Sequence, residues 1–184
     1  MSKSFYRHTI RPNSGTIRQL QKELVIYAPM MDGAPSQEAD ATYVVYGISP
    51  MWQFAAIADN SICMEVNIPE DRVPGTPLTL EAEYFVGGVG GNQIVAALRY
   101  GIFGLGEAPT PLGSEGWVYF IKVPPASQHT DLLGPLKVPE TKIDGKNQPI
   151  NMQVVVTRLG THPLDTNADA MYLVKVIMRY TGYV

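Results

Sequence analysis

The chain has one cysteine, three histidines and no long apolar run, and each scarcity argues against a class of protein. Cys63 alone cannot form an internal disulfide or a paired-cysteine metal site, which favours manufacture in a reducing cytoplasm. No segment approaches the roughly 18 apolar residues that cross a bilayer, and residues 1–8 are not followed by the apolar stretch of a secretory signal. Three scattered histidines disfavour metal-dependent catalysis, which usually needs several converging ligands. We therefore expect the protein to bind no membrane, no metal and no cofactor.

Acidic residues are absent from the first 22 positions. That stretch holds five basic side chains, whereas the other 162 residues hold nine basic and all seventeen acidic ones, so a segment of net charge +5 precedes a body of net charge −8. This asymmetry predicts a basic N-terminal arm that binds an acidic partner surface, such as a neighbouring copy. A pI near 5.6 argues against nucleic-acid binding by the body. The candidate partner-binding residues are Lys3, Arg7, Arg11, Arg18 and Lys22.

Apolar and polar residues alternate with a period of two in three long segments, 62–68, 78–86 and 94–102. Such segments form strands with one face on a core and the other towards solvent or a partner. Residues 130–138 are a weaker strand candidate because Gly134-Pro135 interrupts them. Many short strands separated by Gly and Pro predict an all-β fold, an antiparallel β-sandwich or jelly roll, spanning 23–184 as one domain behind the arm at 1–22. Further apolar runs occur at 24–28, 42–48, 51–57, 117–123, 149–159 and 171–180.

The arm has two possible conformations. Thr16 and Gln19 have the spacing of a helix capping box, and apolar residues follow at helical spacing. An extended arm that docks on a neighbouring copy fits the same residues equally well. The sequence leaves both open.

The glycine-rich stretch from Gly87 to Asn92 joins two of the predicted long strands. Glycine supplies the positive φ that a hairpin turn needs, so we expect a hairpin here. A phosphate-binding loop is disfavoured, because the stretch lacks the Gly-Lys-Ser/Thr ending and a following helix.

Two polar clusters resemble known sites without completing them. Asp165, Asn167 and Asp169 have the spacing that opens a calcium-binding loop, but the required glycine and closing glutamate are missing, which favours a polar turn. Ser127, His129 and Asp131 would share one face of a strand, yet same-face neighbours lie about 7 Å apart, too far for a catalytic triad.

Aromatic and acidic residues in the strand segments each allow a functional and a purely structural interpretation. Trp52 and Trp117 would stack on sugars if exposed, but each lies in an apolar segment, which favours core packing. Glu81 and Glu83 share the polar face of one strand, and we expect solvated carboxylates rather than an acid/base pair.

A series of short motifs follows in a fixed order along the chain: Trp52-Gln53-Phe54, Asp59-Asn60-Ser61, Ile68-Pro69-Glu70-Asp71, Gly75-Thr76-Pro77-Leu78-Thr79-Leu80, Gly91-Asn92, Leu98-Arg99-Tyr100, Arg158-Leu159, Asp165-Thr166, Asp169-Ala170 and Ile177-Met178-Arg179-Tyr180-Thr181. This order, over about residues 42–184, resembles small β-sandwich structural proteins of tailed bacteriophages, which decorate heads or belong to tails and baseplates. The resemblance implies a jelly roll, frequently trimeric, with no catalytic residues, and does not separate head from tail.

Our first functional hypothesis is therefore a non-enzymatic capsid decoration or cement protein on the virion exterior. It would oligomerise, as a trimer, and bridge major capsid proteins. Apolar residues on both faces near 117–123 and 171–180 support an assembly role, because a sandwich buried on one face does not need them. The alternatives are a tail, baseplate or fibre component that acts as an adaptor or binds a receptor or glycan, and an enzyme on a jelly-roll scaffold.

Overall fold

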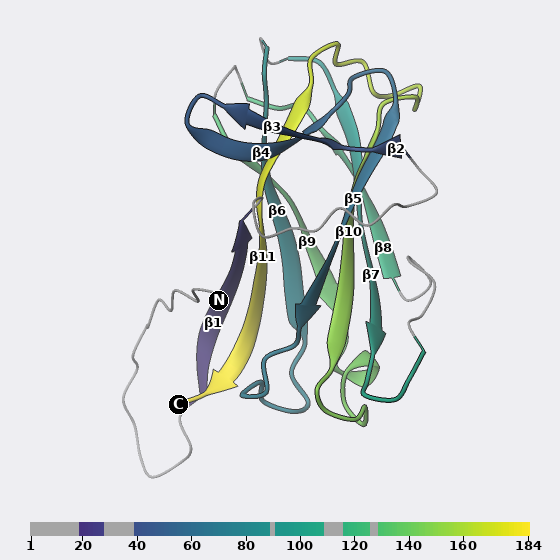
Figure 1. Ribbon diagram of the computed structural model, residues 1–184. Helices are drawn as coiled ribbons and strands as arrows, with labels where there is room; N and C mark the ends of the chain where they lie inside the picture. Colours follow the sequence, from purple (N-terminus) through teal and green to yellow (C-terminus); the bar gives the residue numbers. More distant parts are fainter. Residues whose placement is uncertain (1–18, 28–38, 89–90, 109–115, 126–128) are drawn as a thin grey trace.

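A computed structural model describes residues 19–27, 39–88, 91–108, 116–125 and 129–184. Two β-sheets pack face to face, and the only regular helix in these residues is the short 3-10 turn η2 (Glu140–Lys142) (Figure 1). Sheet A contains β1 (Gln19–Tyr27), β3 (Thr42–Tyr46), β4 (Ser49–Phe54), β6 (Leu78–Val86), β9 (Asp131–Val138) and β11 (Met171–Tyr183). Sheet B contains β2 (Ala39–Asp40), β5 (Asp59–Asn67), β7 (Ile94–Phe103), β8 (Gly116–Lys122) and β10 (Asn151–Leu159).

The order of the strands is that of a jelly roll. Sheet A runs β3-β4-β11-β6-β9 and sheet B runs β2-β5-β10-β7-β8. The eight strands from β4 to β11 thus form two four-stranded halves, and the chain passes back and forth between them. Every pair is antiparallel except the short pair of β2 with β5. The predicted all-β sandwich of jelly-roll type is confirmed.

The core lies between the two sheets and is filled by the apolar members of the alternating strands. In β6, residues Leu78, Leu80 and Ala82 are completely buried, and the intervening residues are partly exposed. The β7 strand is buried on both faces, because Val95 and Ala97 have under 4% of their surface exposed although they point away from the sheet interface. Alternation therefore predicts β6 well and underestimates the burial of β7.

The glycine-rich stretch from Gly87 to Asn92 is not a hairpin. The strands that it joins, β6 and β7, lie in different sheets, so they do not pair with each other. A hairpin and a crossing loop both need glycine, so composition alone does not separate them. Gly91 does adopt a positive φ of 118°.

The weakest strand candidate is a strand. β9 runs through Gly134-Pro135, and its proline is accommodated because β9 is the last strand of sheet A. The pairing of β9 with β6 is irregular at this point, since the register shifts between Leu80 and Ala82.

Residues 19–27 form a strand, so the helical alternative is wrong for the part of the arm that the structure describes. β1 pairs along its whole length with β11, from Gln19 opposite Tyr183 to Tyr27 opposite Lys175. A short isolated helix is marginal in water, whereas β11 offers a row of backbone partners. The boundary predicted at residue 22 falls inside β1, and Thr16 lies outside the described residues.

The outer face of sheet A is held by ion pairs between neighbouring strands. Arg179 on β11 contacts Glu23 on β1 and Glu81 on β6, and Lys175 lies 2.7 Å from Glu83. The two glutamates of β6 are therefore paired with cations rather than freely solvated. In the described part of the chain, no helix is long and apolar enough to cross a membrane.

Candidate interaction surface

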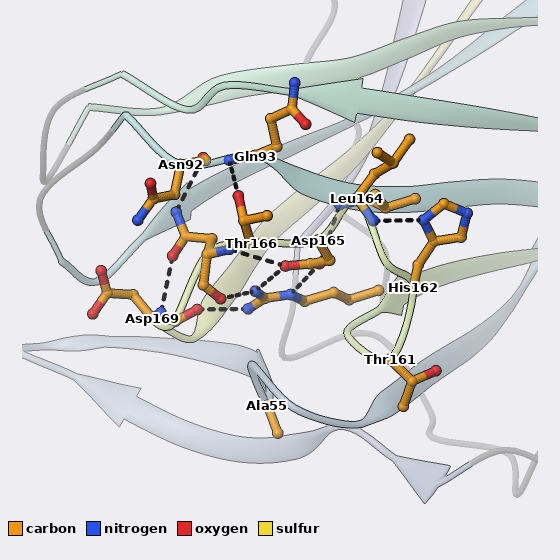
Figure 2. A network of polar contacts seen from close by, with 12 residues as sticks. Ala55, Asn92, Gln93, Thr161, His162, Leu164, Asp165, Thr166 and Asp169 are labelled. Carbon is orange, nitrogen blue, oxygen red and sulfur yellow. Dashed lines mark hydrogen bonds and ion pairs between the residues drawn. The ribbon is translucent and has the colours of Figure 1, made fainter.

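A buried arginine, Arg158 at the end of β10, organises the loop between β10 and β11. Its guanidinium pairs with the Asp165 carboxylate at 2.9 Å and donates to the backbone carbonyls of Asn167 and Asp169 (Figure 2). Both charged side chains of the pair are 0% exposed. The same carboxylate accepts a hydrogen bond from the backbone N–H of Val95, which ties the loop to β7. The segment is the polar turn that we predicted, and its carboxylate and carbonyl oxygens accept hydrogen bonds from Arg158.

Gly88, near the start of the glycine-rich stretch, lies against this loop. A side chain on Gly88 would collide with the Asp169 carboxylate, 1.8 Å from the position of its Cβ. A carboxylate at that position repels phosphate, which agrees with the rejection of a phosphate cradle. Among the described residues, no three His, Cys, Asp or Glu side chains gather as a metal site would require.

The serine, histidine and aspartate candidates for hydrolysis do not form a described triad. Ser127 lies outside the described residues. Asp131 accepts a hydrogen bond from the phenol of Tyr84 at 3.2 Å. Burial, together with the charge of Asp131, raises the pKa of that phenol, so Tyr84 remains a donor at neutral pH. The aspartate is thus engaged with a core tyrosine.

A hollow of about 240 Å³ lies beside the corner that follows β5, and Arg72 and Asp144 in its lining form an ion pair. Arg72 is buried there, contacts Asp144 and donates to the carbonyls of Val73 and Thr76. Desolvation opposes ionisation of Asp144, but hydrogen bonds from the Gly75 N–H and Arg72 outweigh it and lower its pKa. These contacts tie the corner after β5 to the segment around Asp144.

The two tryptophans differ. Trp52 is partly buried against the core and meets Tyr43 edge-on at 5.3 Å, so core packing is confirmed for it. Trp117 is 52% exposed, so the prediction for it is wrong. The β7–β8 register gives the reason: Val118 lies opposite the core residue Leu98, which turns Trp117 outwards.

Four large apolar side chains are exposed along β8 and the residue after it, and we call them the β8 stripe. Each has about half of its surface exposed, and β8 is the last strand of sheet B, so one of its backbone edges has no strand partner among the described residues. The rings of Trp117 and Tyr119 lie at 79° to each other, so they offer no flat platform. The stripe consists of Trp117, Tyr119, Ile121 and Val123.

A second exposed apolar surface lies on the β3–β4 hairpin, residues 42–54. Only residues 52–54 of β4 pair with β11, so the rest of the hairpin overhangs the sheet as a two-stranded ribbon. Ile48 at its turn is 99% exposed, and Val45 is 67% exposed. Tyr46 fixes the ribbon by packing on the rings of Phe85 and Tyr172 at about 5 Å. Tyr46 therefore fixes the ribbon against sheet A, while Val45 and Ile48 remain exposed.

The predicted arm residues are described only in part. Lys3, Arg7, Arg11 and Arg18 lie outside the described residues. Lys22 is in β1, where its ammonium contacts the Asp71 carboxylate and the Tyr183 carbonyl and its side chain is 12% exposed. Its role in partner binding stays a prediction, but the structure gives it a role within the chain.

Cys63 should be nearly inert in the folded protein. It is buried on β5, and burial, assisted by Glu65, raises the pKa of its thiol, although Arg99 acts in the opposite direction. We expect a thiol reagent at neutral pH to modify native protein roughly a hundredfold more slowly than unfolded protein. The measurement is the rate of labelling with and without denaturant.

The matched control for this measurement is Val184→Cys in a Cys63→Ala background, because Val184 is exposed. This control should react at the unfolded rate in both conditions. Equal rates for native and unfolded wild-type protein would contradict the burial of Cys63.

No protein-family model matches the chain, and no curated protein sequence matches it. Solved structures match at low identity. The insecticidal delta-endotoxin Cry8Ea1 of Bacillus thuringiensis is 12% identical over 85% of this chain and 24% of its own, with a TM-score of 0.48. An infectious bursal disease virus structure (Gx strain) is 9% identical over 96% of this chain and 54% of its own, with a TM-score of 0.33.

The third structure is tailspike protein 4 of bacteriophage CBA120, in its enzymatically active domain. It is 7% identical over 88% of this chain and 19% of its own, with a TM-score of 0.35. The chain thus spans between about a fifth and about half of the length of these three proteins. The jelly-roll assignment is given independently by the strand order of the two sheets.

Proposed function

We propose that the protein is a non-enzymatic structural component of a virus particle, a capsid decoration or cement protein that oligomerises, as a trimer, and bridges major capsid proteins on the exterior. The observation that carries the proposal is the exposure of large apolar side chains along two edge strands, β3 and β8. Such surfaces mark protein–protein contacts. The buried charged groups, by contrast, are used to hold loops and corners together.

The charge distribution supports attachment to a capsid. A basic segment in front of an acidic body attracts acidic partner surfaces, and the attraction weakens with salt. The resemblance of the motif order to structural proteins of tailed bacteriophages is consistent with this role. The stability that such a protein adds exists only in the assembled particle, because it binds the folded, assembled state.

The test is binding to capsids of the encoding virus that lack the protein, measured by co-sedimentation at several salt concentrations. Deleting residues 2–18 should abolish attachment and leave the β-sheet circular dichroism unchanged. The deletion must stop at 18, because residues 19–22 belong to β1 and Lys22 contacts Asp71. A matched control keeps the length and replaces Lys3, Arg7, Arg11 and Arg18 by glutamine; undiminished binding by both variants would refute the role of the basic segment.

A tail or fibre component that binds glycans is the second candidate, and the exposure of Trp117 favours it. Stacking of a sugar on this ring would change its fluorescence. We expect no change across a glycan panel, because Trp117 and Tyr119 stand nearly perpendicular and the stripe continues with aliphatic residues. Immunogold labelling of virions separates head from tail directly.

A further inference from the structure

We infer that the β3–β4 hairpin of one copy binds the β8 stripe of the next copy, in a head-to-tail contact that closes into a ring. The inference rests on the proposed function, since it names the contact by which the structural protein would oligomerise. It covers the two exposed apolar surfaces defined above, the β3–β4 hairpin and the β8 stripe, with a second copy of the chain.

The chemistry of the two surfaces matches. No Asp, Glu, Lys or Arg occurs between Asp40 and Asp59, a stretch that includes the whole hairpin. On β8 itself the only charged residue is Lys122, whose neighbours on either side in sequence belong to the stripe. Neither surface offers the charges by which a foreign partner is selected, whereas each offers apolar side chains that the other can cover.

The positions of the two surfaces dictate the symmetry. β3 is the first strand of sheet A, β8 is the last strand of sheet B, and β8 contacts β9, the other end of sheet A, so the surfaces lie on opposite flanks of the sandwich (Figure 1). One contact between unlike surfaces therefore leaves a free hairpin on one copy and a free stripe on the other. Such heterologous contacts close into rings or continue as filaments, and the expected trimer is a closed ring.

The exposed area is sufficient for a specific contact. The side chains that remain half exposed or more on each surface present on the order of 400 Å². Together they supply about 800 Å², half of the roughly 1,600 Å² that a standard interface buries, so the contact must also bury backbone and flanking groups. A symmetric contact between two β8 stripes would leave both hairpins exposed, whereas a ring covers both surfaces on every subunit.

The experiment compares the masses of two charge variants by light scattering after size exclusion. Ile48→Lys places a charge at the tip of the hairpin, and Trp117→Lys places one in the β8 stripe. Each should weaken association at least about tenfold and give monomers, because every contact in the ring uses one hairpin and one stripe. Val184→Lys is the control with an exposed apolar residue outside both surfaces, and it should assemble like the wild type.

Mixing the two variants gives the decisive result. The intact stripe of Ile48→Lys can bind the intact hairpin of Trp117→Lys, while the remaining surfaces repel, so an equimolar mixture should stop at a dimer of one copy of each. Circular dichroism confirms that both variants are folded. If either is not, Val45→Lys or Tyr119→Lys takes its place, since both positions are exposed.

Three results would overturn the inference: a wild-type chain that stays monomeric at the highest concentration it tolerates, an Ile48→Lys variant that still oligomerises, or a mixture that remains monomeric. The second result would indicate β8–β8 pairing and the first a foreign occupant. A monomer that still attaches to capsids would refute the ring and leave the proposed function intact. A ring that does not attach to capsids would support the inference and refute the proposed function.

Discussion

Replacing Arg158 by methionine should lower the free energy of unfolding by about 3–5 kcal/mol, because the substitution leaves a fully buried carboxylate without its cation. The Asp165 side chain is 0% exposed, and Arg158 supplies two of the hydrogen bonds to its oxygens. The carbonyls of Asn167 and Asp169 lose their donor at the same time. Chemical denaturation followed by circular dichroism measures the loss.

The matched control is Arg179→Met on the outer face of sheet A. Arg179 also contacts two carboxylates, but its side chain is 35% exposed, so water replaces the lost contacts. Exposed ion pairs contribute at most about 1 kcal/mol. If the two variants unfolded at similar denaturant concentrations, the proposed role of Arg158 in holding the loop between β10 and β11 would be wrong.

Replacing Phe54 by alanine should cost about 3–5 kcal/mol of stability, the range for deleting a buried phenyl ring from a core. Phe54 is 0% exposed at the end of β4, opposite Met171 of β11. It is one of three β4 residues that pair with β11, so its loss also loosens the hairpin that we assign to assembly. Thermal unfolding of the monomeric Trp117→Lys background separates this effect from oligomerisation.

Ile57→Ala, three residues later, is the control, since Ile57 is 86% exposed and should change stability by less than about 0.5 kcal/mol. The ring inference adds a second readout. Phe54→Ala should weaken association as well as stability, because a loosened hairpin presents its outward residues less well. A variant that is destabilised yet assembles with wild-type affinity would show that the hairpin is held by Tyr46 and its ring contacts alone.

Strand positions could be predicted from the sequence because alternation is a local property. In β6 the pattern of buried and exposed residues follows the apolar pattern closely. Residues 130–138 were harder, since Gly134-Pro135 is tolerated only because β9 is an edge strand, and edge position is a property of the whole sheet.

Pairing between strands could not be predicted in the same way. The glycines at 87–91 permit a hairpin and a crossing loop alike, and only the assembled sheets distinguish them. The orientation of Trp117 depends on the register of β8 against β7, which a segment with apolar residues on both faces does not specify. The surplus of apolar residues at 117–123 did indicate a surface beyond the core, but not which residues form it.

The ion pair between Arg158 and Asp165 could be anticipated from the sequence only through the Asp-x-Asn-x-Asp spacing of the loop. Asp165, Asn167 and Asp169 signalled a polar turn, but the residue that organises them, Arg158, lies inside the apolar segment 149–159 and was given no role. An arginine inside an apolar strand segment, followed within ten residues by aspartate, is a signal that could have been used. The uncharged stretch between Asp40 and Asp59 was equally readable and marks the hairpin.

The course of β1 along the final strand has a consequence for how the protein would grip a particle. β1 begins with Gln19 opposite Tyr183 at one end of the sandwich, whereas the β3–β4 hairpin lies at the other end (Figure 1). In a ring, equivalent residues of all subunits lie at the same height along the symmetry axis. The Gln19 ends of all copies would therefore lie at one height, and the basic N-terminal arms would begin there. Several individually weak electrostatic tethers would then engage together, and avidity rather than single-site affinity would set the residence time.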